Sequence, residues 1–375
     1  MTIQTDFPIQ TDILGRQSIF DSYIPVTFAY PVEDISLRET ILRTLKDGLH
    51  RLGQSFPWTA GQVVYKSAAA DGENGMRIPM IMPLSDSSSS SEGELAPASP
   101  PLTVKDLSRD DAIPSFATLQ AKHFPFSAAV MHESYLSPRR ASPGVDPTEP
   151  TTQPTFMVQA TWLKGGLLLT IVGHHAAMDA MGLGQVMALL CKACKNVPFT
   201  QEEIVSGNRR RDNSIPLLED HHNDDAAEKP VSKEHFLPRA TTTTTTRSPL
   251  PEKPNKCSWV YFDFDASSLT ALKAEATKTL PVRMMSGQQQ SSARKQESGS
   301  TTTTTTTTTA PFVSTDDALS ALIWQSILRA RRPRLDPAAT TTLARAVDIR
   351  HLLGLSANYP GEAQVNSYAT ATVAS

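Results

Sequence analysis

The stretch FMVQATWLKGGLLLTIVGHHAAMDAMGLG, residues 156–184, joins two apolar runs to a cluster of polar side chains. Residues 156–164 and 167–173 have the composition of strands, and Gly165-Gly166 between them is typical of a two-residue hairpin. Two histidines and an aspartate, His174, His175 and Asp179, come directly after the second run. The second strand therefore delivers two imidazoles to its carboxyl end.

The two histidines are expected to point in different directions, because successive side chains on a strand alternate between its faces. A neutral imidazole with one nitrogen held and the other free is a competent general base near neutral pH. Asp179 follows His175 by four residues, and in a turn that enters a helix this spacing lets the aspartate orient the loop or the ring. The residues alone leave open a second interpretation, a satisfied histidine of the core. A metal site is not expected, because adjacent strand histidines diverge.

Bulk composition limits the class of protein. With 375 residues, 39% apolar content and a net charge of -3, the chain can bury a sizeable core and is long enough for two domains. The balance of 35 basic and 38 acidic residues argues against nucleic acid as a partner. No run approaches the roughly 18 apolar residues of a membrane span, and the first residues do not resemble a signal peptide. A cytoplasmic location is the resulting expectation.

Other familiar catalytic patterns are missing from the sequence. Three cysteines are too few for a disulfide framework, and Cys191 and Cys194 lie in the helical pattern QVMALLCKACK without a second pair, so neither a metal nor a redox site is predicted. Neither the G-x-S-x-G pattern of serine hydrolases nor the G-x-x-x-x-G-K pattern of phosphate-binding loops occurs. A serine nucleophile is therefore unsupported.

The remaining patterned segments alternate between helix and strand, which predicts an α/β protein of two α+β halves. The expected helices are residues 35–52, 266–278 and 314–331, and the expected strands are residues 61–65, 259–265 and 343–350. Ser314 or Thr315 can cap the helix 314–331, whose apolar face would comprise Leu319, Leu322, Ile323 and Ile327.

Low-complexity tracts separate these segments. Residues 85–101, about 200–256 and 286–309 are rich in Ser, Thr, Gln and Pro and are predicted to be mobile surface insertions. The expected division is an N-terminal half at 1–195, a crossover and linker at 196–256, and a C-terminal half at 257–375.

The turn itself resembles the H-H-x-x-x-D-G motif of the BAHD acyl-CoA-dependent acyltransferases. Ala180 stands here where that motif has its glycine. Further segments, from DILGRQSIFDSYIPVTFAYPV near the N-terminus to RAVDIRHLLGLSANYPGEAQVNSY near the C-terminus, resemble fungal trichothecene 3-O-acetyltransferase-like proteins in the same order. The resemblance covers every patterned segment and skips the low-complexity tracts.

This resemblance implies two chloramphenicol-acetyltransferase-like halves with a channel between them. His175 would deprotonate a hydroxyl for direct attack on the thioester of acetyl-CoA or another acyl-CoA, with no permanently bound cofactor. Asp179 would face away and pair with an arginine of the second half, which corresponds to Arg350, while His174 would have a supporting role. The acceptor would be a hydroxyl of a hydrophobic, trichothecene-like fungal metabolite, and the protein would be a monomer.

One departure from the family keeps other functions open. The chain has no counterpart of the family's D-F-G-W-G motif, which predicts an incomplete second half. A homologue that only binds CoA or metabolite, or a stand-alone condensation-type domain, are the alternatives. The basic side chains of Arg329, Arg331, Arg332 and Arg334 could meet CoA phosphates, but a helix dipole already explains cations at a helix C-terminus. No CoA-binding residue is therefore predicted.

Overall fold

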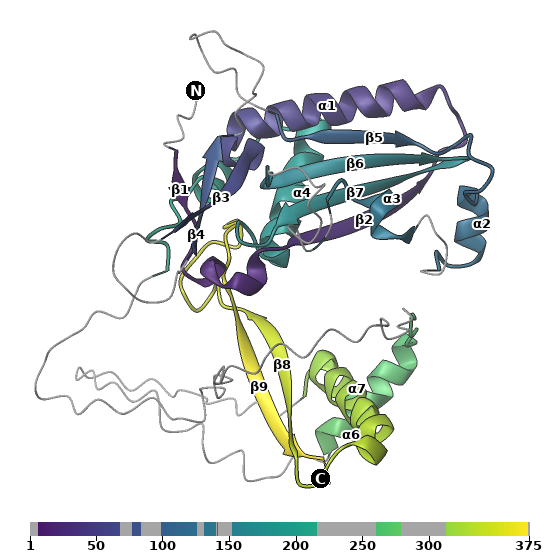
Figure 1. Cartoon of the computed structure of the whole chain (residues 1–375), viewed down its shortest axis with the longest axis vertical. Coiled ribbons are helices and arrows are strands. Elements are labelled where there is room, and N and C mark those ends of the chain that lie inside the picture. The colour runs from purple at the N-terminus through teal and green to yellow at the C-terminus, as the bar shows by residue number, and fades with distance from the viewer. Residues whose placement is uncertain are drawn as a thin grey trace, which may run out of the picture. The chain divides into compact units, whose positions relative to one another are not determined.

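The structure is a computed structural model that describes residues 7–67, 77–83, 99–125, 131–139, 141, 152–215, 260–278 and 313–373. The chain divides into two compact units (Figure 1). Unit 1 comprises Met1–Val260 and Val347–Val365, and unit 2 comprises Tyr261–Ala346 and Asn366–Ser375. The later segment of unit 1 matters for function, because it brings residues from far along the sequence to the histidines.

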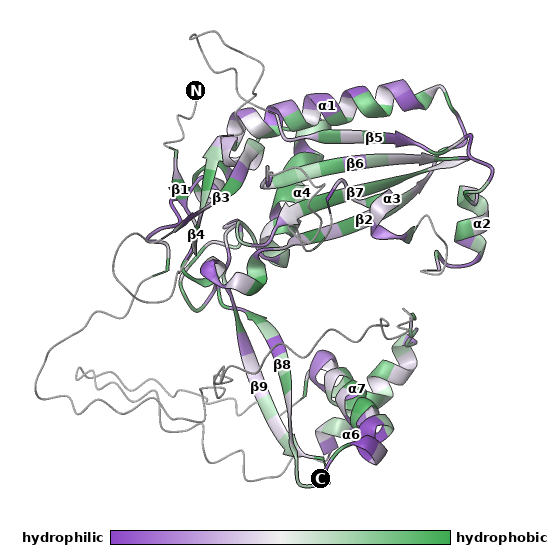
Figure 2. Cartoon of the chain, viewed as in Figure 1, coloured by the Kyte–Doolittle hydropathy of each residue, from purple (hydrophilic) through white to green (hydrophobic). Residues whose placement is uncertain are grey.

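Unit 1 is built on a four-stranded sheet in the order β2-β7-β6-β5. Its strands are β2 (Tyr23–Pro31), β7 (Gly166–His174), β6 (Phe156–Leu163) and β5 (Leu102–Asp106). β5 pairs with β6 in parallel, and the other neighbours are antiparallel. A smaller sheet has the order β1 (Ile9–Gln10), β4 (Arg77–Pro83), β3 (Gly61–Ser67). Every residue of β6 is buried, and Figure 2 shows that β6 and β7 are the most continuously apolar strands of the larger sheet.

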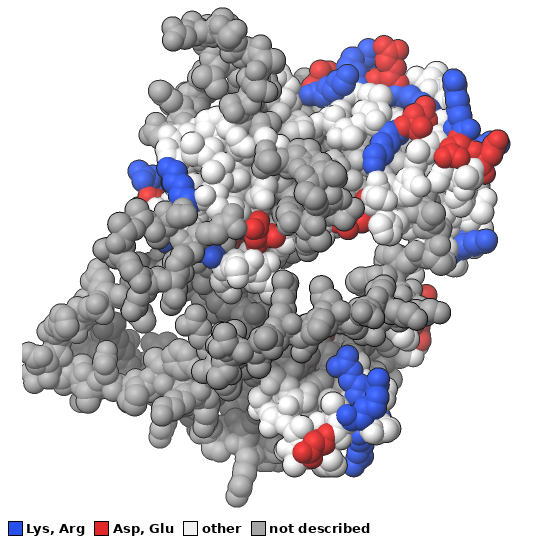
Figure 3. All heavy atoms as spheres, viewed as in Figure 1, with Lys and Arg blue, Asp and Glu red and all other residues white. Residues whose placement is uncertain are grey.

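Two helices cover one face of this sheet. α1 (Leu37–Ser55) and α4 (Ala180–Cys194) pack against each other and share one core with β6 and β7. The predicted apolar stripe of α1 is present, since Leu45, Leu49 and Leu52 are buried, but its first member, Leu37, is exposed. Basic and acidic side chains are interspersed over α1 and its surroundings in Figure 3.

The remaining helices of unit 1 are short. They are η1 (Leu14–Arg16), η2 (Ser18–Phe20), η3 (Pro57–Ala60), α2 (Phe116–Ala121), α3 (Glu133–Leu136) and α5 (Gln201–Gly207). The turns η1 and η2 lie beside the loop that follows β8 in Figure 1, and hydrogen bonds join Asp12, which precedes the N-cap residue of η1, to that loop.

The hairpin between β6 and β7 forms as predicted, but its loop is shifted by one residue. Leu163 lies opposite Gly166, so the two loop residues are Lys164 and Gly165. Gly165 has φ +82°, in the left-handed region that favours glycine. Gly166 instead begins β7, where a Cβ would lie 2.2 Å from the ring of Phe116. The two glycines therefore serve different needs: one forms the turn, and the other allows a close approach.

Unit 2 contains α6 (Ala266–Lys278), α7 (Thr315–Arg331), η8 (Arg332–Arg334) and most of the two-stranded sheet of β8 (Thr340–Asp348) and β9 (Gln364–Thr372). Ser314 caps α7 through a reciprocal capping box with Asp317. Of the apolar face expected for α7, Leu322, Ile323 and Ile327 are exposed, and the buried residue of the helix is Ala318.

The strand predicted at 259–265 is wrong. Residues 260–265 form no strand, and Val260 and Phe262 are exposed. Asp265 instead accepts a hydrogen bond from the backbone of Ser268 in the first turn of α6, at 2.8 Å. Alternating apolar residues form a strand only where a second strand pairs with them, and the described part of the chain supplies none here.

Several expectations lie wholly or partly outside the described residues. The low-complexity tract 286–309 is outside them, as are most of 85–101 and residues 216–256 of the expected linker. The division into halves at 1–195 and 257–375 stays a prediction, although Val347–Val365 group with unit 1. Among the helices the structure describes, none has the length and apolar character needed to span a membrane.

Candidate functional site

The two histidines lie where β7 ends and a tight turn leads into α4. His174 is the last residue of β7, and its carbonyl accepts hydrogen bonds from the backbone N–H groups of Ala177 and Met178. Asp179 is the N-cap of α4 and accepts the Gly182 N–H at 2.7 Å. The sequence pattern thus folds as one unit in which the strand end places the imidazoles and the aspartate starts the helix.

His175 is partly exposed and held on two sides. Its ring stacks on Phe20 with centroids 4.3 Å apart, and its Nδ1 lies 3.1 Å from Oε2 of Glu362. The side chain of His175 is 20% exposed, whereas that of Glu362 is 0% exposed. No residue that the structure describes hydrogen-bonds Nε2. The ring is therefore fixed through one nitrogen, with the other available to a substrate.

His174 points into a closed environment instead. Its Nδ1 lies 3.3 Å from the backbone N–H of Ala176, which donates to it, and its Nε2 lies 3.2 Å from Oε1 of Gln153. Burial, with a smaller contribution from the charge of His175, lowers the pKa of His174 to about 3. His174 is therefore neutral, with its proton on Nε2, and the carboxylate of Asp21 at 3.9 Å forms no ion pair with it.

The expected ion pair between Asp179 and Arg350 is present and is bidentate. The Nη2 and Nη1 atoms of Arg350 lie 2.8 and 2.9 Å from the two carboxylate oxygens, and both side chains are buried. Burial acts to lower the pKa of Arg350, but the hydrogen bonds and charge of Asp179 raise it overall. Asp179 does not contact the His175 ring through any hydrogen bond that the structure describes, so it orients the loop rather than the imidazole.

Arg350, which the expected division places in the C-terminal half, groups with unit 1. The physical reason is that its loop is tied to the histidine turn. Arg350 donates to the carbonyls of Tyr359 at 2.9 Å and Gly361 at 2.6 Å, and the Ala363 N–H donates to Asp179 at 3.0 Å. The pair therefore closes a site within one compact unit.

A close backbone approach completes this arrangement. A Cβ on Gly182, in the first turn of α4, would lie 2.1 Å from the carbonyl oxygen of Pro360. The helix that Asp179 starts thus packs directly on the loop that carries Glu362. Gly184, two residues further along α4, has open space around it.

A buried carboxylate from the N-terminus holds the same loop. Asp12 accepts the hydroxyl of Tyr359 and, at 3.0 Å, the backbone N–H of Glu362. Burial raises the pKa of Asp12, while Arg211 and these hydrogen bonds oppose the shift. Burial also raises the pKa of Glu362, which its hydrogen bond with His175 opposes. Three buried carboxylates, on Asp12, Asp179 and Glu362, therefore surround the histidine turn.

Sequence reasoning missed Glu362 and Asp12. Glu362 lies 187 residues from His175 in sequence, and Asp12 precedes the first patterned helix. Neither occupies a recognisable motif, so the only sequence signal was that each lies in a segment that resembles the family, Asp12 near the N-terminus and Glu362 near Arg350.

Of the two cysteines that the structure describes, Cys194 has a packing role. Cys191 is exposed, and Cys194 packs so closely on α1 that a Cβ on Gly48 would lie 2.4 Å from its sulfur. Within the described ranges, no three His, Cys, Asp or Glu side chains are grouped as a metal site would need. Arg329, Arg331, Arg332 and Arg334 are exposed at the end of α7 and in η8, consistent with the helix-dipole explanation.

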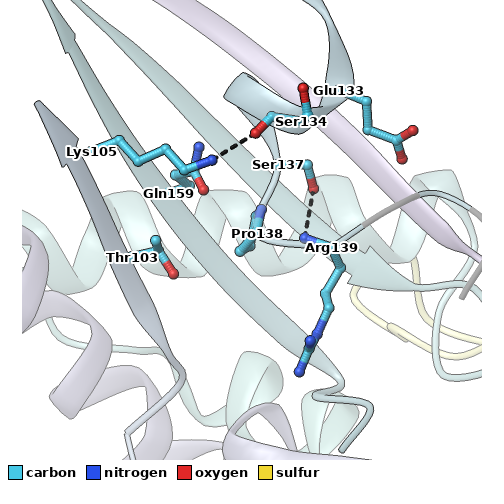
Figure 4. A pocket seen from close by; sticks show the side chains of 8 residues that line it. All are labelled: Thr103, Lys105, Glu133, Ser134, Ser137, Pro138, Arg139 and Gln159. Atoms are coloured by element: carbon cyan, nitrogen blue, oxygen red, sulfur yellow. Dashed lines mark hydrogen bonds between the residues drawn. The ribbon is translucent and has the colours of Figure 1, made fainter. Parts of the chain in front are cut away.

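A separate hollow of about 300 Å³ lies against β5, β6 and α3 in unit 1 (Figure 4). Lys105 spans it to donate to the carbonyl of Ser134 at 2.7 Å, and Gln159, whose Oε1 is buried without a described partner, forms part of its wall. His175 is not among the residues that line it. The hollow is therefore separate from the histidine site.

Comparison with known proteins identifies the family. Residues 22–194 match the trichothecene 3-O-acetyltransferase-like N-terminal domain, and residues 142–375 match the Transferase family. The chain is a trichothecene 3-O-acetyltransferase-like member of the Transferase family. It is an acyltransferase, as the sequence predicted.

The relatives support this assignment over the whole chain. An O-acetyltransferase of Cryptosporiopsis sp. is 36% identical over 99% of this chain and 70% of its own length. Trichothecene 3-O-acetyltransferase of Fusarium sporotrichioides is 35% identical over 100% of this chain and 70% of its own length. The crystal structure of that Fusarium enzyme with coenzyme A and T-2 matches with a TM-score of 0.73 at 34% identity, covering 98% of this chain and 70% of the enzyme.

The fold extends to a more distant protein. Vinorine synthase matches with a TM-score of 0.51 at 14% identity, which shows a shared fold alone. The mixed α/β fold expected from the sequence is thus confirmed.

Proposed function

We propose that this chain transfers an acetyl group from acetyl-CoA to a hydroxyl of a trichothecene-like fungal metabolite, with His175 as the general base. The observation that carries the proposal is the state of the His175 ring. Its Nδ1 is engaged at 3.1 Å by a buried carboxylate, and its side chain is partly exposed. The named relative that binds coenzyme A and T-2 supports this choice of donor and acceptor.

The chemistry follows from these positions. Nε2 of His175 takes the proton of the acceptor hydroxyl as its oxygen attacks the thioester carbonyl carbon. The tetrahedral intermediate then expels the CoA thiolate, which recovers the proton from the imidazolium. The ester and free CoA are the products, and no covalent acyl-enzyme forms. General bases of this kind contribute about 10²- to 10⁴-fold to rate.

Asp179 and Arg350 have an indirect role in this proposal. They hold the turn that presents His175, and neither touches its ring through a described hydrogen bond. The description of the molecule as two chloramphenicol-acetyltransferase-like halves, its monomeric state and its cytoplasmic location remain predictions from the sequence.

The test is acetyl transfer by the purified full chain. Acetyl-CoA and a trichothecene alcohol such as deoxynivalenol are mixed with the protein, and both ester and free CoA thiol are measured. The proposal expects one thiol released per ester formed. Transfer from an acyl-carrier donor but not from acetyl-CoA would identify a condensation-type domain, and CoA binding without ester formation would identify a binding protein; either result would overturn the proposal.

A further inference from the structure

Glu362 is a buried acid whose one described side-chain hydrogen bond is to His175. The side chain is 0% exposed, Oε2 lies 3.1 Å from Nδ1 of His175, and Oε1 has no described hydrogen-bond partner. Burying a carboxylate is costly unless a partner compensates it. Since the imidazole is that partner, the position of Glu362 needs an explanation that involves the ring.

The backbone around Glu362 is fixed from two directions. Its own N–H donates to Asp12 at 3.0 Å, and the N–H of Ala363 donates to Asp179 at 3.0 Å. A Cβ on Gly15, beyond Asp12, would lie 3.4 Å from the Cβ of Glu362, so the N-terminal turn closes against it. The carboxyl group is therefore aimed at His175 by rigid surroundings rather than by a chance rotamer.

We propose that Glu362 is a positioning residue that accepts the Nδ1–H of His175, leaves Nε2 as the base and stabilises the imidazolium formed during transfer. This inference rests on the function proposed above. A neutral acceptor at Nδ1 would also select the tautomer, but only an anion adds the stabilisation of the positive charge. Phe20 stacks on the ring and restricts its tilt, so the hydrogen bond and the stack together define where Nε2 points.

The charged surroundings give this arrangement a pH dependence. Burial raises the pKa of Glu362, the His175 hydrogen bond lowers it, and the charges of Asp179 and Asp12 raise it further. The other charged or titratable groups tied to these carboxylates are Arg350, Arg211 and Tyr359. Glu362 therefore takes up a proton at a higher pH than an ordinary glutamate.

Protonation of Glu362 would remove the base. A protonated carboxyl donates to Nδ1, which moves the ring proton to Nε2 and leaves no lone pair for the acceptor hydroxyl. Activity is thus present above the pH at which Glu362 is protonated and is lost as the pH falls through it. The acid limb of the activity profile therefore reports the protonation of Glu362.

The first test reads the tautomer directly and does not depend on activity. NMR of the full chain with ¹⁵N-labelled histidine reports which ring nitrogen carries the proton, and a H175N sample assigns the signals. The wild type should show His175 with its proton on Nδ1, with His174, protonated on Nε2, as the internal contrast. In E362A the His175 proton should move largely to Nε2. An unchanged Nδ1–H form in E362A would overturn the proposal.

The second test uses kinetics and a matched control. E362Q is nearly isosteric, folds without a buried charge and cannot be protonated at this position. Its kcat should fall about 10- to 100-fold, less than the roughly 10²- to 10⁴-fold that loss of a general base itself costs, while KM for acetyl-CoA stays the same. The acid limb of its kcat profile should move to lower pH, and E362D should recover part of kcat. The control is E202Q, since Glu202 contacts the same segment at Ser356 and Asn358 and should change nothing.

The outcomes separate this inference from the proposed function. Full activity of H175A would overturn the function itself. Loss in H175A together with unchanged kcat and acid limb in E362Q would overturn the role of Glu362 alone. The wild-type NMR spectrum at the pH of the activity assay requires no variant: an Nδ1–H form of His175 supports the proposal, and an Nε2–H form contradicts it.

Discussion

The adjacent histidines belong to two different regions of unit 1. His174 lies in a closed pocket, where a backbone N–H and an amide oxygen engage both of its nitrogens and burial keeps it neutral. His175 lies on the loop side, stacked on Phe20 and joined to Glu362, with part of its ring exposed. One dipeptide thus supplies a structural histidine and a reactive one. The alternation of side chains at a strand end is enough to separate the two roles.

The largest expected effect is the contrast between the two alanine variants. H175A should lose about 10²- to 10⁴-fold in the rate of acetyl transfer, the range of general-base contributions, and should stay folded with a moderately lower unfolding temperature, because buried Glu362 loses its partner. H174A removes a buried, hydrogen-bonded ring, so it should mainly lower the stability of the protein and should reduce activity less than H175A does. Calorimetry and initial rates measure both. Greater loss of activity from H174A than from H175A would reverse the assignment.

The next effect concerns the ion pair that closes the loop over α4. D179N and R350A should each destabilise the protein by about 3 to 5 kcal/mol, because R350A leaves the buried Asp179 without a counter-charge and D179N leaves Arg350 with the partly exposed Asp348 as its ionic partner. The double variant should cost less than the sum of the two, with a coupling of roughly 0.5 to 3 kcal/mol. Unfolding of the four proteins in denaturant gives this coupling. Strictly additive losses would show that the contact between Asp179 and Arg350 does not stabilise the site.

A smaller effect tests the close approach of α4 to the Glu362 loop. G182A should cost about 1 to 3 kcal/mol, because its Cβ would meet the Pro360 carbonyl and the loop would have to move. G184A, in the same helix with open space around it, is the matched control and should stabilise by roughly 0.5 to 1 kcal/mol. Equal effects of the two substitutions on the unfolding temperature would argue against the packed loop.

The last effect is the pH dependence that His174 contributes, which is spread over several pH units. Its pKa is lowered from 6.5 to about 3 in the folded protein, so below pH 6.5 the unfolded chain binds a proton that the folded chain does not. The contribution of neutral His174 to the free energy of unfolding is therefore complete above pH 6.5. On acidification it falls by about 1.4 kcal/mol per pH unit, down to about pH 3. H174N should show a shallower acid slope of unfolding free energy, whereas H50Q, at an exposed position on α1, should keep the wild-type slope.

Local patterns predicted several helices and strands, among them the strand that carries the histidines. The leucine spacing of α1, the strand composition on either side of Gly165 and the capping sequence at Ser314 each act within a few residues, and each element formed. The hairpin loop lies one residue earlier than predicted. Gly166 is a glycine because β7 packs closely on Phe116 and not because it forms the turn, and the sequence does not reveal that contact. The strand expected at 259–265 failed for a related reason, since a strand needs a partner that local composition cannot supply.

The site was only partly accessible from the sequence. The turn from His174 to Asp179 is a contiguous motif, and the resemblance supplied Arg350. Glu362 and Asp12 reach the site through contacts across 187 and 350 residues, and no local pattern marks such contacts. Burial also raises the pKa of both carboxyl groups, and burial is a property of the folded chain that the sequence does not show.

The most direct test of the different roles of the two histidines is chemical modification of the folded wild type. Diethyl pyrocarbonate is added while acetyl transfer is measured, and fragment-ion mass spectrometry locates the modified ring within the peptide that holds both residues. The account predicts that activity is lost in step with modification of His175, that acetyl-CoA slows both, and that buried His174 stays unmodified. Loss of activity that follows modification of His174, or full activity with His175 modified, would contradict it.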